Sequence, residues 1–438
     1  MSSTFSQLPS AATHSSLDLF QKPPVLINFD YGSMQEVHTK SGIDGPTLDF
    51  EIQTDRNCFL DMSEVYLRLY VRIVNLTTGK TIDTTTDKIM LANNSLHSLF
   101  DNCEVSLNGE QISTSNGLYA HKAFVTTEWS HPSSCKDSVL QCQGYSIEED
   151  PANLTGNFKE ASAETDDLFV GGVTSGKYYL FGKLAVDFFT CDKLLVPKSL
   201  LRIRLQKSTS TNFVLKWCGD DNANEAVGYA VKWEKASLYT KQMTVSENIY
   251  ASIEKALLRT PARYTYTDTI AKTFIIPAGQ STFVRENVLD NKPIRSLAIA
   301  FNTNEAFRGN KRLNPFHYQT FGLQRIVVYR NGQALFDNSL RDGGLVQLYH
   351  NTVRNLHYKH DGPGIGLRNY KDHFVVVYDL TSTAESNNEI YYPELVGGSI
   401  RLELTFEKAL DKSVEVFLLG EQLNTVYVKS TGEVNKDG

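Results

Sequence analysis

The ten histidines are the first residues to test for metal or acid–base chemistry, and they are scattered along the chain. The sequence contains neither HxH nor HExxH, the spacings that bring two imidazoles to one metal ion. His357 and His360 form an HxxH beside a predicted helix end. That pair is either a metal site or a solvated loop, and we predict no metal ligands.

Two segments resemble ligand-binding loops only in part. Asp220–Glu225 begins like a calcium loop, but its sixth residue is Glu225 instead of glycine, and its twelfth is Val231 instead of glutamate. Gly362–Gly366 is rich in glycine, yet it does not follow a strand and open a helix as a dinucleotide loop does. No P-loop is present. We predict no cofactor.

Residues for nucleophilic or glycosidic catalysis are equally sparse. His131 lies near Cys135, but Pro132 and neighbouring serines indicate a loop, and no GxSxG is present. Only three tryptophans, at positions 129, 217 and 233, are available as a sugar platform. Paired catalytic carboxylates cannot be picked out by spacing. We predict no catalytic residue and expect that the protein is not an enzyme. The alternative is a glycan-cleaving hydrolase or a carbohydrate-binding module.

Composition places the chain among globular proteins. It has 438 residues, 41% hydrophobic and 21% charged, with a net charge of −7. That charge disfavours a surface that binds nucleic acid throughout, which is usually basic. The basic clusters 308–312 and 354–368 favour a solvated or subunit-facing surface more than contact with packaged nucleic acid.

Six cysteines lack CxxC and paired metal spacing. The N-terminus is polar and has no basic start followed by an apolar core, so we expect no secretory signal. No apolar run approaches the roughly 18 residues of a membrane span. We therefore expect reduced thiols, synthesis in the cytosol and no membrane span.

Short alternating runs between turn signals predict mostly strands. In Ser399–Phe406, the residues Ile400, Leu402, Leu404 and Phe406 share one face, as a period of two requires when that face packs inward. Helical spacing appears at 117–129, 246–259 and 345–356. Thr244 and Glu247 fit a capping box for the second of these helices, and Pro261 follows it.

A weak internal duplication organises these elements. Each half has an alternating strand that closes on Asn-Gly, one of the candidate helices, an apolar strand ending in aspartate, and a further strand. In sequence order these are 102–112, 117–129, 181–187 and 195–205 in the first half, and 323–335, 345–356, 374–379 and 395–404 in the second. Residues 65–73 also match 294–301. The alternative is that any two β domains share such patterns.

We therefore predict an all-β chain of two tandem eight-stranded jelly rolls with a few short helices. The predicted bounds are a mobile arm at 1–25, a first jelly roll at 26–245, a linker helix at 246–262, a second jelly roll at 263–428 and a disordered tail at 429–438. The polar loop 134–175 and the segment 220–225 are expected to project from the first domain.

This arrangement resembles the double-jelly-roll major capsid proteins of double-stranded DNA viruses, and within them the Polinton/Maverick, adintovirus and virophage-like lineage. The segments that carry the resemblance are LFDNCEVSLNGEQIS (99–113), LLVPKSLLRIRLQKS (194–208) and YPELVGGSIRLELTFEKAL (392–410). They are strand and turn patterns, and the resemblance covers residues 25–428.

The resemblance implies a structural role in a virion. Three copies of two similar domains would form a homotrimeric, pseudo-hexagonal capsomer, and capsomers would tile an icosahedral shell around double-stranded DNA. The implied partners are further copies of the chain, a penton or minor capsid protein, and the packaged DNA indirectly. The resemblance supplies no catalytic, metal or cofactor residues.

Overall fold

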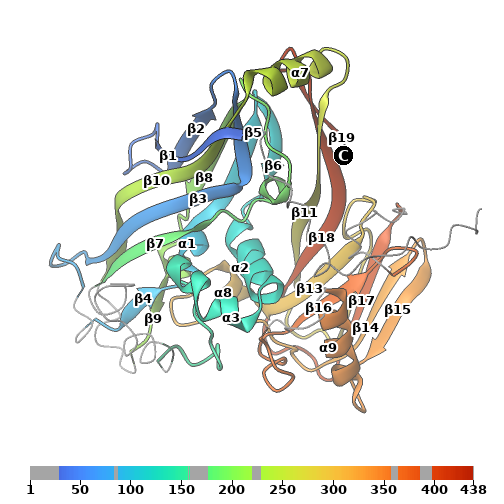
Figure 1. Cartoon of the computed structure of the whole chain (residues 1–438). Coiled ribbons are helices and arrows are strands. Elements are labelled where there is room, and N and C mark those ends of the chain that lie inside the picture. The colour runs from blue at the N-terminus through green and yellow to red at the C-terminus, as the bar shows by residue number, and fades with distance from the viewer. Residues whose placement is uncertain are drawn as a thin grey trace, which may run out of the picture.

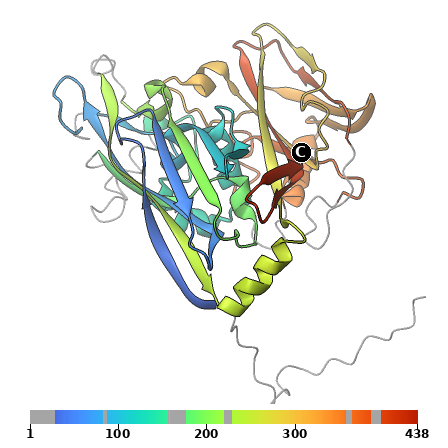
Figure 2. The ribbon, with the colours of Figure 1, turned by 90° about the horizontal axis from the view of Figure 1, so that it is seen from above.

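The computed structural model describes residues 29–82, 87–155, 157, 176–219, 228–356, 364–384 and 397–437. They form two β-sandwiches that lie side by side, coloured blue to green and yellow to red in Figure 1 and seen from above in Figure 2. The predicted arm at 1–25 lies outside the described residues, as do His357, His360 and the segment 220–225.

The first sandwich consists of two four-stranded antiparallel sheets in the orders β1-β10-β3-β7 and β2-β8-β5-β6. Strands β4 (Ile89–Leu91) and β9 (Leu215–Trp217) form a separate ribbon. The eight sandwich strands are β1 (Phe29–His38), β2 (Thr47–Gln53), β3 (Cys58–Asn75), β5 (Phe100–Leu107), β6 (Glu110–Thr114), β7 (Lys177–Lys183), β8 (Leu200–Lys207) and β10 (Tyr229–Val245).

The second sandwich repeats the same winding. Its sheets have the orders β11-β18-β13-β16 and β12-β17-β14-β15. Substituting each strand for its counterpart reproduces the first sandwich, so both are jelly rolls and the predicted fold is confirmed. The strands are β11 (Ala262–Ile276), β12 (Thr282–Arg285), β13 (Ser296–Thr303), β14 (Leu323–Arg330), β15 (Gln333–Ser339), β16 (Val375–Asp379), β17 (Ile400–Phe406) and β18 (Val414–Val428).

Alternating apolar residues supply the cores, because one face of each strand turns inward. In β17, Ile400, Leu402, Leu404 and Phe406 are buried, whereas the residues between them are only partly covered. In β3, buried residues from Val65 to Ile73 alternate with half-buried ones in the same way.

The helices are short and lie mainly in the connections. Two longer ones, α2 (Tyr119–Ser130) and α9 (Gly344–Asn355), occupy the same position in their sandwiches, between the Asn-Gly hairpin and the next strand. The others are α1 (Ser95–Ser98), α3 (Ser133–Lys136), η2 (Val139–Gln143), η3 (Asp187–Thr190), α6 (Thr211–Val214), α7 (Glu247–Leu257) and α8 (Asn304–Arg308). None of the described helices is long and apolar enough to cross a membrane.

The two Asn-Gly turns share the same backbone conformation and the same side-chain hydrogen bond, as the duplication predicts. Asn108 and Asn331 have φ of 51° and 52°, and the glycines that follow also have positive φ, as a type I′ turn requires. The Oδ1 of Asn108 accepts a hydrogen bond from the backbone N–H of Leu200 at 2.7 Å. The Oδ1 of Asn331 accepts one from Ser399 at 3.0 Å. Each side chain thus ties its hairpin to the next strand of the sheet.

We expect Asn108→Ala and Asn331→Ala each to lower the free energy of unfolding by about 1–3 kcal/mol. Alanine is strained at this φ and cannot accept the hydrogen bond. Asn→Gly at each position is the matched control, because glycine tolerates the backbone and loses only the side-chain bond. Urea unfolding measures both, and an alanine variant as stable as the wild type would refute the assignment.

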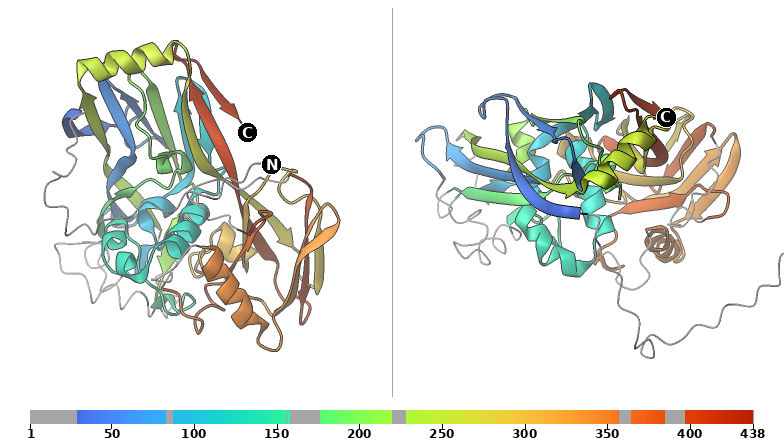
Figure 3. Two further views of the ribbon diagram at one scale, coloured as in Figure 1. Left: turned by 45° about the vertical axis from the view of Figure 1, so that its right-hand side comes forward. Right: turned by 45° about the horizontal axis from the view of Figure 1, so that its top comes forward.

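Helix α7 crosses one end of the first sandwich and leads into the second (Figure 3). Its apolar residues Ile249, Ile253 and Leu257 are packed against the core, as their helical spacing predicts. The predicted capping box is wrong, because Thr244 still belongs to β10 and the N-cap residue, Ser246, makes no side-chain cap hydrogen bond.

The tail differs from the predicted disorder. Residues 434–437 form strand β19 (Val434–Asp437), which pairs with Thr425–Val428 of β18. The ammonium of Lys436 donates to the carbonyl of Ile112 in the first sandwich at 2.7 Å. The hairpin with β18 and the bond to the first sandwich therefore order a segment whose own composition is polar.

The loop predicted to project at 134–175 is packed where it is described. Leu140 and Tyr145 are buried, and η2 lies against β7. The ring of Tyr145 lies 6.0 Å from that of Phe124 in α2. The prediction is therefore wrong for residues 134–155, and residues 158–175 lie outside the described part.

Candidate functional site

The sequence candidates for catalysis do not form a reactive pair. The Nδ1 of His131 donates to the carbonyl of Thr127 in its own helix, at 3.2 Å. The Nδ1 of the ring therefore points to the end of α2 and not to Cys135. Burial lowers the pKa of His131. This geometry gives Cys135 no activating base.

The described residues also bring no candidate metal or nucleotide site together. Among the residues that the structure describes, no group of three or more His, Cys, Asp or Glu side chains could hold a metal ion. Gly364 has φ of 73°, and a Cβ there would lie 2.9 Å from the Cβ of Ser133. This glycine thus permits a close contact between the two sandwiches. Residues 362 and 363 of the predicted turn lie outside the described part.

A sugar platform would need exposed aromatic rings beside an acid of raised pKa. Trp129 and Trp217 are buried, and Trp233 lies under the ammonium of Lys207 at 4.3 Å. One groove, on the outer face of sheet β2-β8-β5-β6, holds three acids, Asp49, Glu51 and Glu104.

All three carboxylates already have partners, and Glu104 accepts a hydrogen bond from the side-chain amide of Asn102 at 3.1 Å. Arg204 binds Asp49 at 2.6 Å and Arg202 binds Glu51 at 2.9 Å. Hydrogen bonding and charge from Lys40, together with Arg202, lower the pKa of Glu51. A lowered pKa is the reverse of what a general acid needs, so this groove does not suit glycoside hydrolysis.

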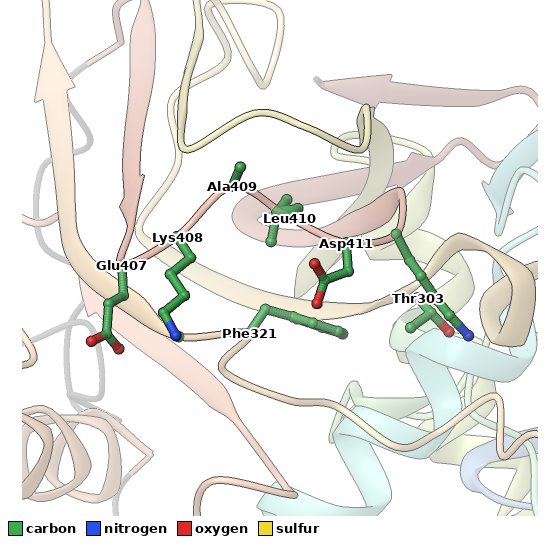
Figure 4. A pocket seen from close by; sticks show the side chains of 9 residues that line it. Thr303, Phe321, Glu407, Lys408, Ala409, Leu410 and Asp411 are labelled. Atoms are coloured by element: carbon green, nitrogen blue, oxygen red, sulfur yellow. The ribbon is translucent and has the colours of Figure 1, made fainter.

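A small pocket of about 390 Å³ lies at the end of the second sandwich (Figure 4). The connection after β17 forms one wall, and Thr303 and Phe321 form the other. Its charged side chains alternate in sign along the chain: Glu407, Lys408, Asp411 and Lys412. The pocket is a gap between loops and presents no convergent set of acids.

A cluster of buried polar and aromatic residues lies between the two sandwiches. His121, Phe124 and Glu128 are three and four residues apart on α2, so one face of this helix carries all three. The ring of His121 stacks on Phe307 with centroids 3.7 Å apart. The ring of Phe124 stacks on Phe316 at 4.3 Å.

The hydrogen bonds of His121 fix its tautomer. Its Nε2 lies 3.3 Å from the carbonyl oxygen of Phe307, which can only accept, so Nε2 carries the proton. Its Nδ1 then accepts from the hydroxyl of Tyr318 at 3.1 Å. Burial of the neutral ring lowers its pKa to about 3.

A second histidine joins the sandwiches as a cation. His373 Nδ1 lies 2.7 Å from the carboxylate of Glu128, and Nε2 lies 2.9 Å from the carbonyl of Glu148. Both partners accept, so the ring donates from both nitrogens and is charged. Burial opposes that charge, but the two glutamates outweigh it and raise the pKa of His373.

Glu148 lies beside this pair and is itself buried between the sandwiches. Its carboxyl accepts from the side-chain amide of Asn314 at 2.7 Å. Burial raises its pKa to about 7, although that hydrogen bond acts in the opposite direction. Its burial and hydrogen bonding make it a structural group and not an accessible acid.

The basic clusters are partly used in the same interface. The carbonyl of Lys311 accepts a hydrogen bond from the backbone N–H of Trp217 in β9 of the first half. Arg308 instead binds the buried Glu415 within the second sandwich, at 2.7 Å. Half of the second cluster, 357–363, lies outside the described residues. Sequence reasoning missed the interface residues Glu128, Glu148 and His373, which come from three distant segments and share no motif.

The outer face of sheet β1-β10-β3-β7 has a different character. Tyr66 stacks on Phe181 with centroids 5.2 Å apart, and Tyr70 stacks on Tyr179 at 4.3 Å. Tyr179 is 54% exposed and Phe181 40%. We call this surface the aromatic face and define it by these four residues together with Tyr239.

Comparison with known proteins gives the same fold. A chain of the Sputnik virophage structure matches with a TM-score of 0.70 and 12% identity, covering 98% of this chain and 92% of the other. The mavirus major capsid protein matches at 0.60 and 12%, covering 100% and 96%. The capsid of the virus PBCV-1 matches at 0.60 and 9%, covering 96% and 99%.

The chain has the double-jelly-roll fold of these viral capsid proteins. At sequence level, it is 19% identical over 381 residues to the uncharacterized protein F54H12.2 of Caenorhabditis elegans, covering 82% of this chain and 86% of that protein. No family model matches the sequence.

Proposed function

We propose that the chain is a major capsid protein. It forms homotrimeric, pseudo-hexagonal capsomers, and these tile an icosahedral shell around double-stranded DNA. The observation that carries the proposal is the same jelly roll wound twice in one chain, matching capsid structures over nearly the whole length of both. Three such chains supply six similar domains for a closed ring.

The residues suit a protein that packs beside copies of itself. Its buried polar groups join the two sandwiches instead of facing a substrate cleft. Several outward charges are paired within the chain, so copies can meet without leaving those charges unpaired. The proposal includes membership of the Polinton/Maverick, adintovirus and virophage-like lineage, location in the virion after synthesis in the cytosol, and a penton or minor capsid protein as a further partner.

Electron microscopy of the purified full chain tests this function. At rising protein concentration we expect three-lobed particles with a hexagonal outline, and then sheets or shells built from them. Weak contacts repeated over many capsomers become strong in aggregate, so assembly should depend steeply on concentration. Isolated single chains at every concentration, salt and pH would contradict the proposal.

A further inference from the structure

The helices α2 and α9 hold equivalent positions in the two sandwiches but differ in burial. In α2, ten of twelve residues are buried. In α9, only Leu348 and Thr352 are buried, and Val346 is 51% exposed. Part of the difference arises because the second sandwich covers α2, through Phe307 and Phe316.

Part of the surface that covers α2 is the outer face of sheet β11-β18-β13-β16 in the second sandwich. Phe417 of β18 lies 5.8 Å from His121, and Phe417 is buried. Its neighbours on that face, Ala300 of β13 and Val375 of β16, are buried as well. One contact inside the chain thus joins a helix side of sandwich one to the outer sheet face of sandwich two.

In the described part of the chain, the counterparts of these two surfaces are exposed: α9 corresponds to α2, and the aromatic face corresponds to the outer face of sheet β11-β18-β13-β16. Strand β10 is the counterpart of β18, and its Tyr239 faces outwards beside Tyr66 on the aromatic face. The sheet that carries this face lies on the side of the first sandwich away from the second (Figures 1 and 2). Among the residues that the structure describes, α9 and the aromatic face are therefore the exposed counterparts of the two surfaces that meet inside the chain.

We propose that the aromatic face binds the α9 side of the second sandwich of a neighbouring copy, repeating between chains the contact that exists within the chain. The inference rests on the proposed function, because the threefold symmetry of a trimer supplies the rotation with which this head-to-tail contact closes into a ring of six domains. Stacked aromatic side chains provide large contact area at low entropic cost, as interfaces favour.

Several charged side chains on this face already form ion pairs within the chain. Arg72 binds Glu234 at 2.7 Å, and Lys183 lies 3.4 Å from Glu64. Arg68 binds Glu36 and also lies over the ring of Tyr239, 4.9 Å from its centroid. A neighbouring copy can therefore cover the aromatic rings without stranding these paired charges.

The first test is Phe181→Glu with Tyr179→Glu, measured by sedimentation over a range of concentrations. We expect the concentration for half-trimerisation to rise by more than about tenfold, because anchors at the centre of interfaces carry most of the binding. Val284→Glu, at a 51% exposed position on β12, is the matched control and should leave association unchanged. A double variant that trimerises like the wild type would overturn the inference and leave the proposed function standing. A wild type that stays monomeric would overturn both.

The second test needs no destabilising charge. In a Cys142→Ser background, which removes an exposed thiol, we introduce Tyr179→Cys with Val346→Cys and treat the protein with a bis-maleimide. We expect covalent dimers and trimers and no larger product, because the ring closes at three. The pair Val284→Cys with Val346→Cys is the control and should give no ladder. Equal ladders from both pairs, or none from the first, would overturn the inference.

Discussion

Replacing His373 with alanine is expected to lower the free energy of unfolding by about 3–5 kcal/mol, since it strands a buried carboxylate. Glu128 is 2% exposed, and its other oxygen already has no hydrogen-bond partner. The charged ring of His373 is therefore the group that compensates for this buried glutamate. Urea unfolding of the purified variant measures the loss.

A double-mutant cycle separates this pair from simple packing. Glu128→Leu combined with His373→Leu removes both charges, so the double variant should be more stable than either single variant. If the two single losses simply add, the ion pair does not hold the sandwiches together.

The second large effect is a loss of stability in acid that depends on His121. Its pKa is lowered from 6.5 to about 3 in the folded protein, so the folded state binds fewer protons than the unfolded state. Stability is therefore complete above pH 6.5 and falls as the pH drops towards 3. A shift of this size corresponds to about 4–5 kcal/mol at the acid end.

His121→Gln isolates that contribution. The amide can donate to the carbonyl of Phe307 and accept from Tyr318, as the ring does, but it does not titrate. Because His97 is also buried, with a pKa lowered to about 4, some acid sensitivity should remain in the variant. The test is the difference between the two curves of stability against pH. Parallel curves between pH 7 and 4 would show that His121 does not titrate on unfolding.

The strand pattern was predictable from the sequence because each signal is local. Asn108-Gly109 and Asn331-Gly332 fix hairpin turns through their own backbone preferences. Alternation in 400–406 follows from one buried face. The order of these signals in both halves was enough to predict two similar sandwiches, and the sheet orders confirm it.

What the sequence did not reveal depends on contacts between distant segments. The tail looks polar, yet β19 forms a hairpin with β18, and the bond from Lys436 to Ile112 ties it to the first sandwich. Glu128, Glu148 and His373 likewise meet only because the second sandwich docks on α2. No local spacing encodes such a meeting, so these residues had no signal to find.

The mass of the full chain in solution tests the central claim most directly. A capsid subunit of this fold should sediment as three chains of 49.1 kDa, a particle of about 147 kDa, at micromolar concentration and moderate salt. A single species of 49.1 kDa across salt, pH and concentration would contradict the account.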